Sequence, residues 1–153
     1  MTIIAWDGHT LAADKQATAG ELRTRVTKLM RLKSGEILAM SGELAPGLSV
    51  AEWYKNGADP KEWPEFQRTE AWSRLIVASS AGAFFYEQFP VKIHVEEPFA
   101  AWGSGRDFAL GAMERGATAI EAVEVASKFC CQCGLGVDFF DIAPKTRAPR
   151  APR

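Results

Sequence analysis

The sequence predicts an α+β fold in which two stacked sheets are covered by helices. Three features lead to this prediction: about eight short runs of β-forming residues, one helical region after the first strands, and two consecutive helical patterns near the C-terminal end. The strand runs are apolar on both faces, so each sheet must be covered on both sides. Two sheets packed face to face, with helices outside, meet this requirement better than one sheet exposed to water.

The composition indicates one soluble globular domain. Of the 153 residues, 47% are hydrophobic and 24% are charged, and the net charge is −1. This charge gives no reason to expect nucleic acid or an anionic membrane as partner. No apolar run approaches the roughly 20 residues that span a bilayer, and no secretory signal is visible, so we expect a cytoplasmic protein. The domain is expected over residues 1–142. Residues 143–153 carry three prolines and four cationic residues and are expected to be a disordered tail.

Alternation and turn signals place the strands. An Asp-Gly turn, Asp7-Gly8-His9, separates the first two strands and predicts a hairpin. The strands are expected at residues 3–6, 10–13, 23–32, 36–40, 73–79, 83–89, 99–102 and 137–142, with 91–95 extended.

Capping signals place the helices. The first is expected over residues 48–54, where Ser49 and Glu52 have the spacing of a capping box. The second runs from 106 to 115 and has Ser104 as its expected N-cap. The third begins at Thr118, and its expected buried face is Ile120, Val123, Ala126, Phe129 and Cys130. Residues 58–71 contain two prolines and read as a loop or broken helix.

The first residues carry the strongest chemical hypothesis. Removal of Met1 would leave Thr2 with a hydroxyl and a free α-amine, directly before an apolar strand. An α-amine has a pKa of about 7.7 to 8.0, so a usable fraction is unprotonated near neutral pH. A nucleophile and a general base would then lie on one residue. Met-Thr alone is a weak signal, and it needs support from elsewhere in the chain.

Two charged residues could provide that support. Asp14 lies at the end of the second strand, and Lys28 lies between Val26 and Met30 on one face of the expected strand 23–32. Gly42 lies where a strand passes into a helix, and a backbone N–H at such a junction suits an oxyanion hole.

The cysteines give no sign of a metal or cofactor. All three lie in the run Cys130-Cys131-Gln132-Cys133, which suits reduced thiols on a helix better than a disulfide framework. His9 and His94 are distant in sequence, so no metal site is expected.

With these positions identified, the sequence resembles the proteasome β-subunit family, especially its bacterial HslV-type branch of N-terminal-nucleophile (Ntn) hydrolases. The matching pieces occur in the family's order. They are residues 2–5, 12–18, 26–31, 40–42 and 103–110, which read TIIA, AADKQAT, VTKLMR, MSG and GSGRDFAL. The resemblance implies a four-layer αββα sandwich and peptide-bond hydrolysis by a terminal threonine.

The resemblance also implies a role for each matching residue. Thr2 matches the nucleophile, Lys28 the neighbouring cation, and Asp14 the acid that pairs with it. Gly42 matches the oxyanion donor, and Ser104 the serine that hydrogen-bonds near the terminal amine. The family's acid near the end of the last helix falls at Cys131, which is a departure from the pattern.

Substrate and assembly follow from the same resemblance. By position, the pocket for the residue before the cut would be lined by Ala17, Val26, Met30, Met40 and Leu44. Main-chain bonds near Thr18 and Gly42 would hold an unfolded protein or peptide substrate. A homo-oligomeric ring of six or seven subunits is implied, and the resemblance also allows a second ring and an ATP-dependent unfoldase. Four aromatic residues are candidates for an apolar surface that a subunit interface would cover, although the tryptophans among them could equally lie in the core: Trp53, Trp63, Phe66 and Trp72.

Two alternatives remain open at this point. A catalytically inactive, structural member of the family would need no free threonine, although Thr2, Asp14 and Lys28 are all present here. An Ntn amidase acting on small amides would use the same terminal chemistry, and the short chain without an added subdomain slightly favours the peptidase.

Overall fold

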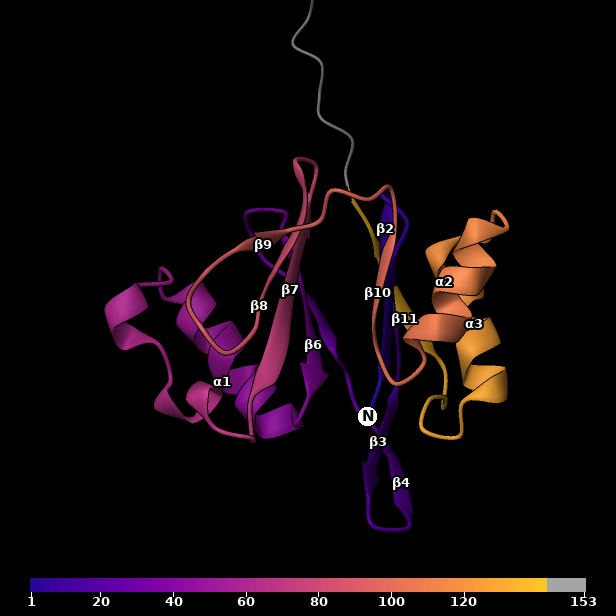
Figure 1. Ribbon diagram of the computed structural model, residues 1–153, viewed down its shortest axis with the longest axis horizontal. Coiled ribbons are helices and arrows are strands. Elements are labelled where there is room, and N and C mark those ends of the chain that lie inside the picture. The colour runs from indigo at the N-terminus through magenta and orange to yellow at the C-terminus, as the bar shows by residue number, and fades with distance from the viewer. Residues whose placement is uncertain (143–153) are drawn as a thin grey trace, which may run out of the picture.

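Two sheets packed face to face form the centre of the protein (Figure 1). The computed structural model describes residues 1–142, and the expected tail at 143–153 lies outside these residues. One sheet has the order β10 (Ala100–Gly103), β1 (Ile3–Trp6), β2 (Thr10–Asp14) and β11 (Val137–Asp141). The other has the order β5 (Leu29–Arg31), β6 (Ile37–Gly42), β7 (Ser73–Ser79), β8 (Gly82–Tyr86) and β9 (Ile93–His94). Helix α1 (Leu44–Lys55) covers one side, and α2 (Arg106–Glu114) with α3 (Ala119–Phe129) covers the other. The predicted αββα layering is confirmed.

The turn between β1 and β2 sets the register of the first hairpin. The Asp7 carboxylate accepts hydrogen bonds from the backbone N–H groups of His9 (2.9 Å) and Thr10 (2.7 Å). This places Ile4 opposite Ala13. Since side chains alternate between faces along a strand, a slip of one residue would turn Thr2 to the other face.

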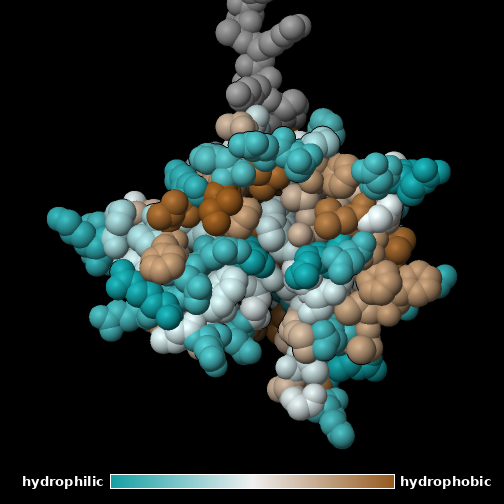
Figure 2. Space-filling model, in the orientation of Figure 1, coloured by the Kyte–Doolittle hydropathy of each residue, from teal (hydrophilic) through white to brown (hydrophobic). Residues whose placement is uncertain are grey.

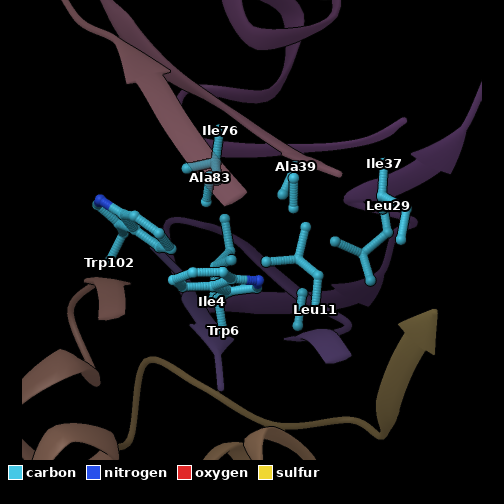
Figure 3. Packing of buried hydrophobic residues seen from close by; sticks show 11 residues of the cluster. Ile4, Trp6, Leu11, Leu29, Ile37, Ala39, Ile76, Ala83 and Trp102 are labelled. Carbon is cyan, nitrogen blue, oxygen red and sulfur yellow. The ribbon is translucent and has the colours of Figure 1, made fainter. Parts of the chain in front are cut away.

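The interface between the sheets is a core of aliphatic and tryptophan side chains. Figure 3 shows Ile4, Trp6 and Leu11 of the first hairpin facing Ala39, Ile76 and Ala83 of the other sheet. Two further cores lie outside the sheets, one beneath α2 and α3 and one beneath α1. Burial of apolar area in three contiguous layers holds the four layers together.

Helix α1 begins earlier than its capping signal predicts. It starts at Leu44 after Glu43, and Ser49 lies inside it, where its hydroxyl donates to the Ala45 carbonyl (3.1 Å). The predicted start at residue 48 and the capping box at Ser49 are therefore wrong. Pro46 in the first turn explains the difference, because the N–H groups of a first turn have no acceptor in the helix and proline lacks that group.

The aromatic residues of this region that were candidates for a subunit interface lie mostly in the core. Trp53 and Trp63 are each only 6% exposed and pack edge to face in the core beneath α1, with Phe66 partly buried beside them. Trp72 is half-buried. The indole N–H groups of Trp53 and Trp63 donate to the carbonyls of Asp59 and Gln88, so neither of these two groups is left unpaired by burial.

The segment after α1 is a pair of 3₁₀ turns, η1 (Pro60–Glu62) and η2 (Glu65–Arg68), in agreement with the predicted loop or broken helix. Gln67 is fully buried and ties the segment to the sheet. Its amide nitrogen donates to the carbonyls of Ser73 and Glu87, and its amide oxygen accepts from the Ser73 N–H.

The two C-terminal helices differ from prediction at their ends. The N-cap of α2 is Gly105, not Ser104, and no side chain caps it. In α3 the predicted Thr118–Glu121 capping box is confirmed. Phe129 was predicted to be buried but is 63% exposed and stacks on Phe108. It lies in the last turn of α3, while the buried side of the helix carries Ala119, Ala122, Val123 and Ala126.

The expected strand at 23–32 is divided in two. Residues Leu22–Arg25 form β4, which pairs with β3 (Gln16–Ala19) in a separate hairpin that projects from the sandwich (Figure 1). The chain joins the main sheet only at β5. The break removes the uniform alternation on which the prediction relied, and it puts Lys28 at the start of the sheet, where it is 5% exposed.

The surface carries apolar side chains in separate patches among hydrophilic ones on the face seen in Figure 2. The exposed large apolar residues include Leu22, Phe89, Val91, Phe108, Phe129 and Phe139. Within residues 1–142, no helix has the length and apolar character to cross a membrane.

Candidate functional site

A buried polar cluster lies at one end of the interface between the sheets. Thr2 donates its hydroxyl hydrogen bond to Asp14 Oδ1 (2.9 Å), and Lys28 Nζ lies 2.6 Å from the same oxygen. Thr2 is 3%, Asp14 0% and Lys28 5% exposed. The three residue types singled out in the sequence are thus in direct contact.

The fold explains why residues so distant in sequence meet. Thr2 immediately precedes β1, and Asp14 ends β2, so the antiparallel hairpin brings them together. Lys28 immediately precedes β5 of the facing sheet and crosses to them. The cluster therefore exists only when the two sheets are stacked.

Asp14 is held by five hydrogen bonds. Oδ1 accepts from the Thr2 hydroxyl, the Ile3 N–H and Lys28 Nζ. Oδ2 accepts from the N–H groups of Gln16 (3.2 Å) and Gly134 (3.0 Å). A carboxylate with this many donors is fixed in position.

Burial and Asp14 act on Lys28 in opposite directions. Desolvation, the larger effect, lowers the pKa of Lys28 below its ordinary value, while the charge of Asp14 and the hydrogen bond to it oppose that change. Lys28 Nζ also lies 3.5 Å from the carbonyl oxygen of Met1. The ammonium group therefore faces the Met1–Thr2 peptide bond.

A pocket of about 110 Å³ opens beside this cluster. Five of the six predicted substrate-binding residues line it: Ala17, Thr18, Val26, Met40 and Leu44. Met30 does not, because it lies beyond the break in the expected strand and packs with the core beneath α1. Gly42 lines the pocket with φ +122°, and a Cβ there would lie 2.9 Å from Ser73 Oγ, so this wall accepts only glycine without rearrangement.

Ser104 is exposed, and no hydrogen bond of its side chain is found among residues 1–142. It nevertheless lies between two residues that touch the Thr2 backbone. The Gly105 N–H donates to the Thr2 carbonyl (3.4 Å), and an added Cβ on Gly103 would lie 2.1 Å from that oxygen. The chain at 103–105 is therefore packed directly against Thr2.

Three residues of the site were missed in the sequence. Gln16 is 1% exposed, lines the pocket and donates to the Thr18 hydroxyl and the Cys131 carbonyl. Its spacing of two from Asp14 was a usable signal. Glu43 lines the pocket next to Gly42. Gly134 offers no sequence signal, because its N–H reaches Asp14 only through the fold.

In the described part of the chain, no group of three or more His, Cys, Asp and Glu side chains is placed to hold a metal ion. The polar cluster contains one carboxylate, one ammonium group and one hydroxyl. Such a set suits proton transfer and nucleophilic attack by the hydroxyl rather than metal ligation.

No protein-family model matches the sequence, and no curated protein matches it. Solved structures do match the fold. BPH of Thiobacillus denitrificans superposes with a TM-score of 0.72 and 21% identity, covering 95% of this chain and 99% of that one. The structure of that protein in complex with Epoxomicin gives 0.71 and 22%, covering 94% and 100%. Eukaryotic HslV from Trypanosoma brucei gives 0.71 and 21%, covering 92% and 98%. The chain therefore has the proteasome-like Ntn-hydrolase fold over nearly its whole length.

Proposed function

We propose that this protein is a threonine endopeptidase of a self-compartmentalising, proteasome- or HslV-like particle, and that removal of Met1 exposes its nucleophile, Thr2. The observation that carries the proposal is the contact of the Thr2 hydroxyl with the buried Asp14–Lys28 pair, at the wall of a pocket. A buried ion pair is weak evidence for stability, since apolar replacements are often as stable. A role in chemistry gives a reason for keeping it.

In this mechanism the α-amine of Thr2 is the general base and its hydroxyl is the nucleophile. Oγ attacks the substrate carbonyl while its proton passes to the amine, through a water molecule. Lys28 keeps the amine unprotonated, because a nearby cation disfavours a second positive charge. Asp14 acts as a positioning residue that holds Lys28 and the hydroxyl.

The oxyanion of the tetrahedral intermediate would be stabilised by the Gly42 N–H. Its place in the pocket lining, at the end of β6, supports this role. For Ser104 we propose a hydrogen bond near the terminal amine. Its place in the segment packed on Thr2 supports that role, and its exposure leaves it free to bond a water or substrate.

The pocket favours an apolar residue before the cut. Ala17, Val26, Met40 and Leu44 would contact its side chain, and Thr18 with Gly42 would bond the main chain of an added substrate strand. A charged side chain would lose hydration without gaining a full set of partners. A peptide library should therefore show apolar or aromatic preference, and selection of Arg or Asp would contradict the assignment.

The proposed assembly is a homo-oligomeric ring of six or seven subunits, with a second ring and an ATP-dependent unfoldase as further partners. Four phenylalanines with exposed side chains could be covered in a contact between subunits: Phe89, Phe108, Phe129 and Phe139 are 44 to 63% exposed. Sedimentation should give a mass of several chains. A mass of one chain at micromolar concentration would remove the particle from the proposal.

The decisive experiment is covalent labelling of processed protein. Intact mass first establishes that Met1 is absent, and a peptide epoxyketone or vinyl sulfone is then added. Because BPH has been solved with Epoxomicin, that compound is a suitable second probe. We expect one adduct per chain at Thr2 and none in Thr2→Ala, while Thr24→Ala, on the exposed strand β4, labels normally.

Two other outcomes separate the rival functions. Labelling that persists in Thr2→Ala would remove Thr2 as nucleophile. Correctly processed protein that is never labelled would favour an inactive structural subunit. Cleavage of small amides without cleavage of peptides would favour the Ntn amidase.

A further inference from the structure

The turn that follows α3 brings two cysteine residues close together in space. Cys130 is the C-cap of α3, and the Cys133 N–H donates to its carbonyl (3.1 Å). Such a turn holds the two Cα atoms within about 7 Å. The thiols of Cys130 and Cys133 are both free. A disulfide requires Cα atoms about 4.4 to 6.8 Å apart, so this turn has the geometry to form one.

The same turn is hydrogen-bonded to Asp14 of the polar cluster and to its neighbours in the chain. Directly after Cys133, the Gly134 N–H donates to Asp14 Oδ2 (3.0 Å), and its carbonyl accepts from the Lys15 N–H (3.1 Å). Within the same turn, the Cys131 carbonyl accepts a hydrogen bond from the Gln16 side-chain amide (3.1 Å). A change in the turn therefore reaches Asp14 through one covalent link and one hydrogen bond.

We propose that Cys130 and Cys133 form a reversible dithiol–disulfide site, and that its oxidation by a low-molecular-weight disulfide weakens the hold on Asp14 and slows the reaction at Thr2. The coupling to Thr2 rests on the proposed peptidase function. The disulfide itself and the movement of the turn do not.

The exchange takes place in two balanced steps. The half-buried Cys130, as thiolate, attacks one sulfur of a small disulfide such as oxidised glutathione and releases one glutathione thiolate, which takes a proton. Cys133 then loses its proton to solvent and attacks Cys130 Sγ, which releases the second glutathione. The protein dithiol is oxidised by two electrons, and the small disulfide is reduced to two thiols.

The order of these steps follows from burial. Cys133 is 4% exposed, and burial, followed by the charge of Asp14, raises the pKa of its thiol. It is therefore a poor first nucleophile.

Closing the bond moves the turn. The two free sulfurs must approach to the bonded distance of about 2.05 Å. The Cys133 sulfur now packs beside Gly105, Ile3 and Ala126, and a shift towards Cys130 withdraws it from these neighbours. Gly134 must follow, so its bond to Asp14 lengthens or breaks.

The test uses full-length processed protein in a series of glutathione redox buffers, with free thiols trapped by iodoacetamide. Peptide mapping should find a Cys130–Cys133 disulfide in wild type and in Cys131→Ser, the exposed neighbour that serves as matched control. Oxidation should slow Thr2 labelling about tenfold in both, as expected for losing one hydrogen bond to a charged group. A thiol reductant should restore the rate, and Cys130→Ser should not respond to oxidation.

Hydrogen exchange separates this proposal from the peptidase assignment. On oxidation, the Gly134 amide should exchange faster in wild type and in Thr2→Ala alike. If reduced protein is never labelled, the peptidase assignment fails, and the redox site is judged by mapping and exchange alone. Absence of the Cys130–Cys133 disulfide in folded protein, or its formation with unchanged Gly134 exchange, would overturn the redox site. If Cys131→Ser kept its full Thr2 labelling rate on oxidation, the redox site would also be overturned, because Cys131 would then be the reactive thiol.

Discussion

Replacing Asp14 by asparagine is the sharpest test of the polar cluster. The substitution keeps the size of the side chain and removes the charge that balances Lys28. Both oxygens of the Asp14 carboxylate accept hydrogen bonds. In either orientation of the asparagine amide, its NH₂ group would therefore face groups that are themselves hydrogen-bond donors. Lys28 would then lose its counter-charge and keep at most a neutral acceptor, which is the amide oxygen of the introduced asparagine in one orientation of the amide or, before processing, the Met1 carbonyl at 3.5 Å.

The magnitude follows from the burial of the pair. Breaking a buried ion pair by removing one partner costs about 3 to 5 kcal/mol. The loss cannot exceed the cost of neutralising Lys28, since an unpaired lysine can release its proton. From an ordinary lysine pKa, this release costs roughly 4 to 5 kcal/mol at about pH 7. We therefore expect Asp14→Asn to lower the free energy of unfolding by about 3 to 5 kcal/mol. For a chain of this length, that corresponds to a fall in Tm of roughly 6 to 20 °C.

The partner substitution should cost less. In Lys28→Met, Asp14 keeps four of its five donors, so the expected loss is about 1.5 to 3 kcal/mol, the worth of one hydrogen bond to a charged group. The double variant should lose less than the sum of the two, because no uncompensated charge remains. As a control, Lys15→Met removes a partly exposed ion pair with Asp138 and should cost about 0 to 1 kcal/mol.

Urea unfolding of the four variants and the wild type measures these differences. The reasoning is refuted if Asp14→Asn costs no more than Lys15→Met, or if the effects of Asp14→Asn and Lys28→Met add in full. Either result would mean that the two charges are not coupled in a buried site.

Three further predictions concern positions outside the cluster. Gly103→Ala should lower the free energy of unfolding by well over about 3 kcal/mol, because its Cβ would lie 2.1 Å from the Thr2 carbonyl oxygen. Gly116→Ala has a similar φ but open space around it, so it should lower the free energy of unfolding by only about 1 to 3 kcal/mol. Urea unfolding midpoints compare the two variants. Thr118→Ala should cost about 1 kcal/mol through loss of the capping box, while Ser49→Ala, inside an exposed helix face, should stay within about 0.5 kcal/mol in the same assay. Burial and the bond to Glu36 raise the pKa of Tyr54 above 10.0, so above about pH 10 the unfolded chain releases a proton that the folded chain keeps, and stability falls as pH rises. Unfolding free energies measured at about pH 9 and 11 should show a smaller fall in Tyr54→Phe, and an equal fall would contradict this linkage.

Local signals in the sequence were sufficient wherever a structure depends on neighbours in the chain. The Asp7-Gly8 turn and the capping box at Thr118 were predicted correctly, because their hydrogen bonds join residues two or three apart. The residue types of the cluster could also be found, since an N-terminal threonine, an acid at a strand end and a lysine among apolar residues are visible in the sequence. Their contact was an expectation from resemblance.

The tertiary structure decided everything that depends on which surface meets which. Helix α1 begins at Leu44 rather than at its apparent cap, Phe129 is exposed although it follows an apolar helical pattern, and Trp63 is buried although its segment reads as loop. Met30 does not line the pocket, because the expected strand is interrupted before β5 and Met30 packs against the core beneath α1. The hold of Gly134 on Asp14 spans 120 positions of the chain. Hydrogen bonds between distant backbone groups and the burial of one layer against another depend on the stacking of all four layers, and no short stretch of sequence contains that information.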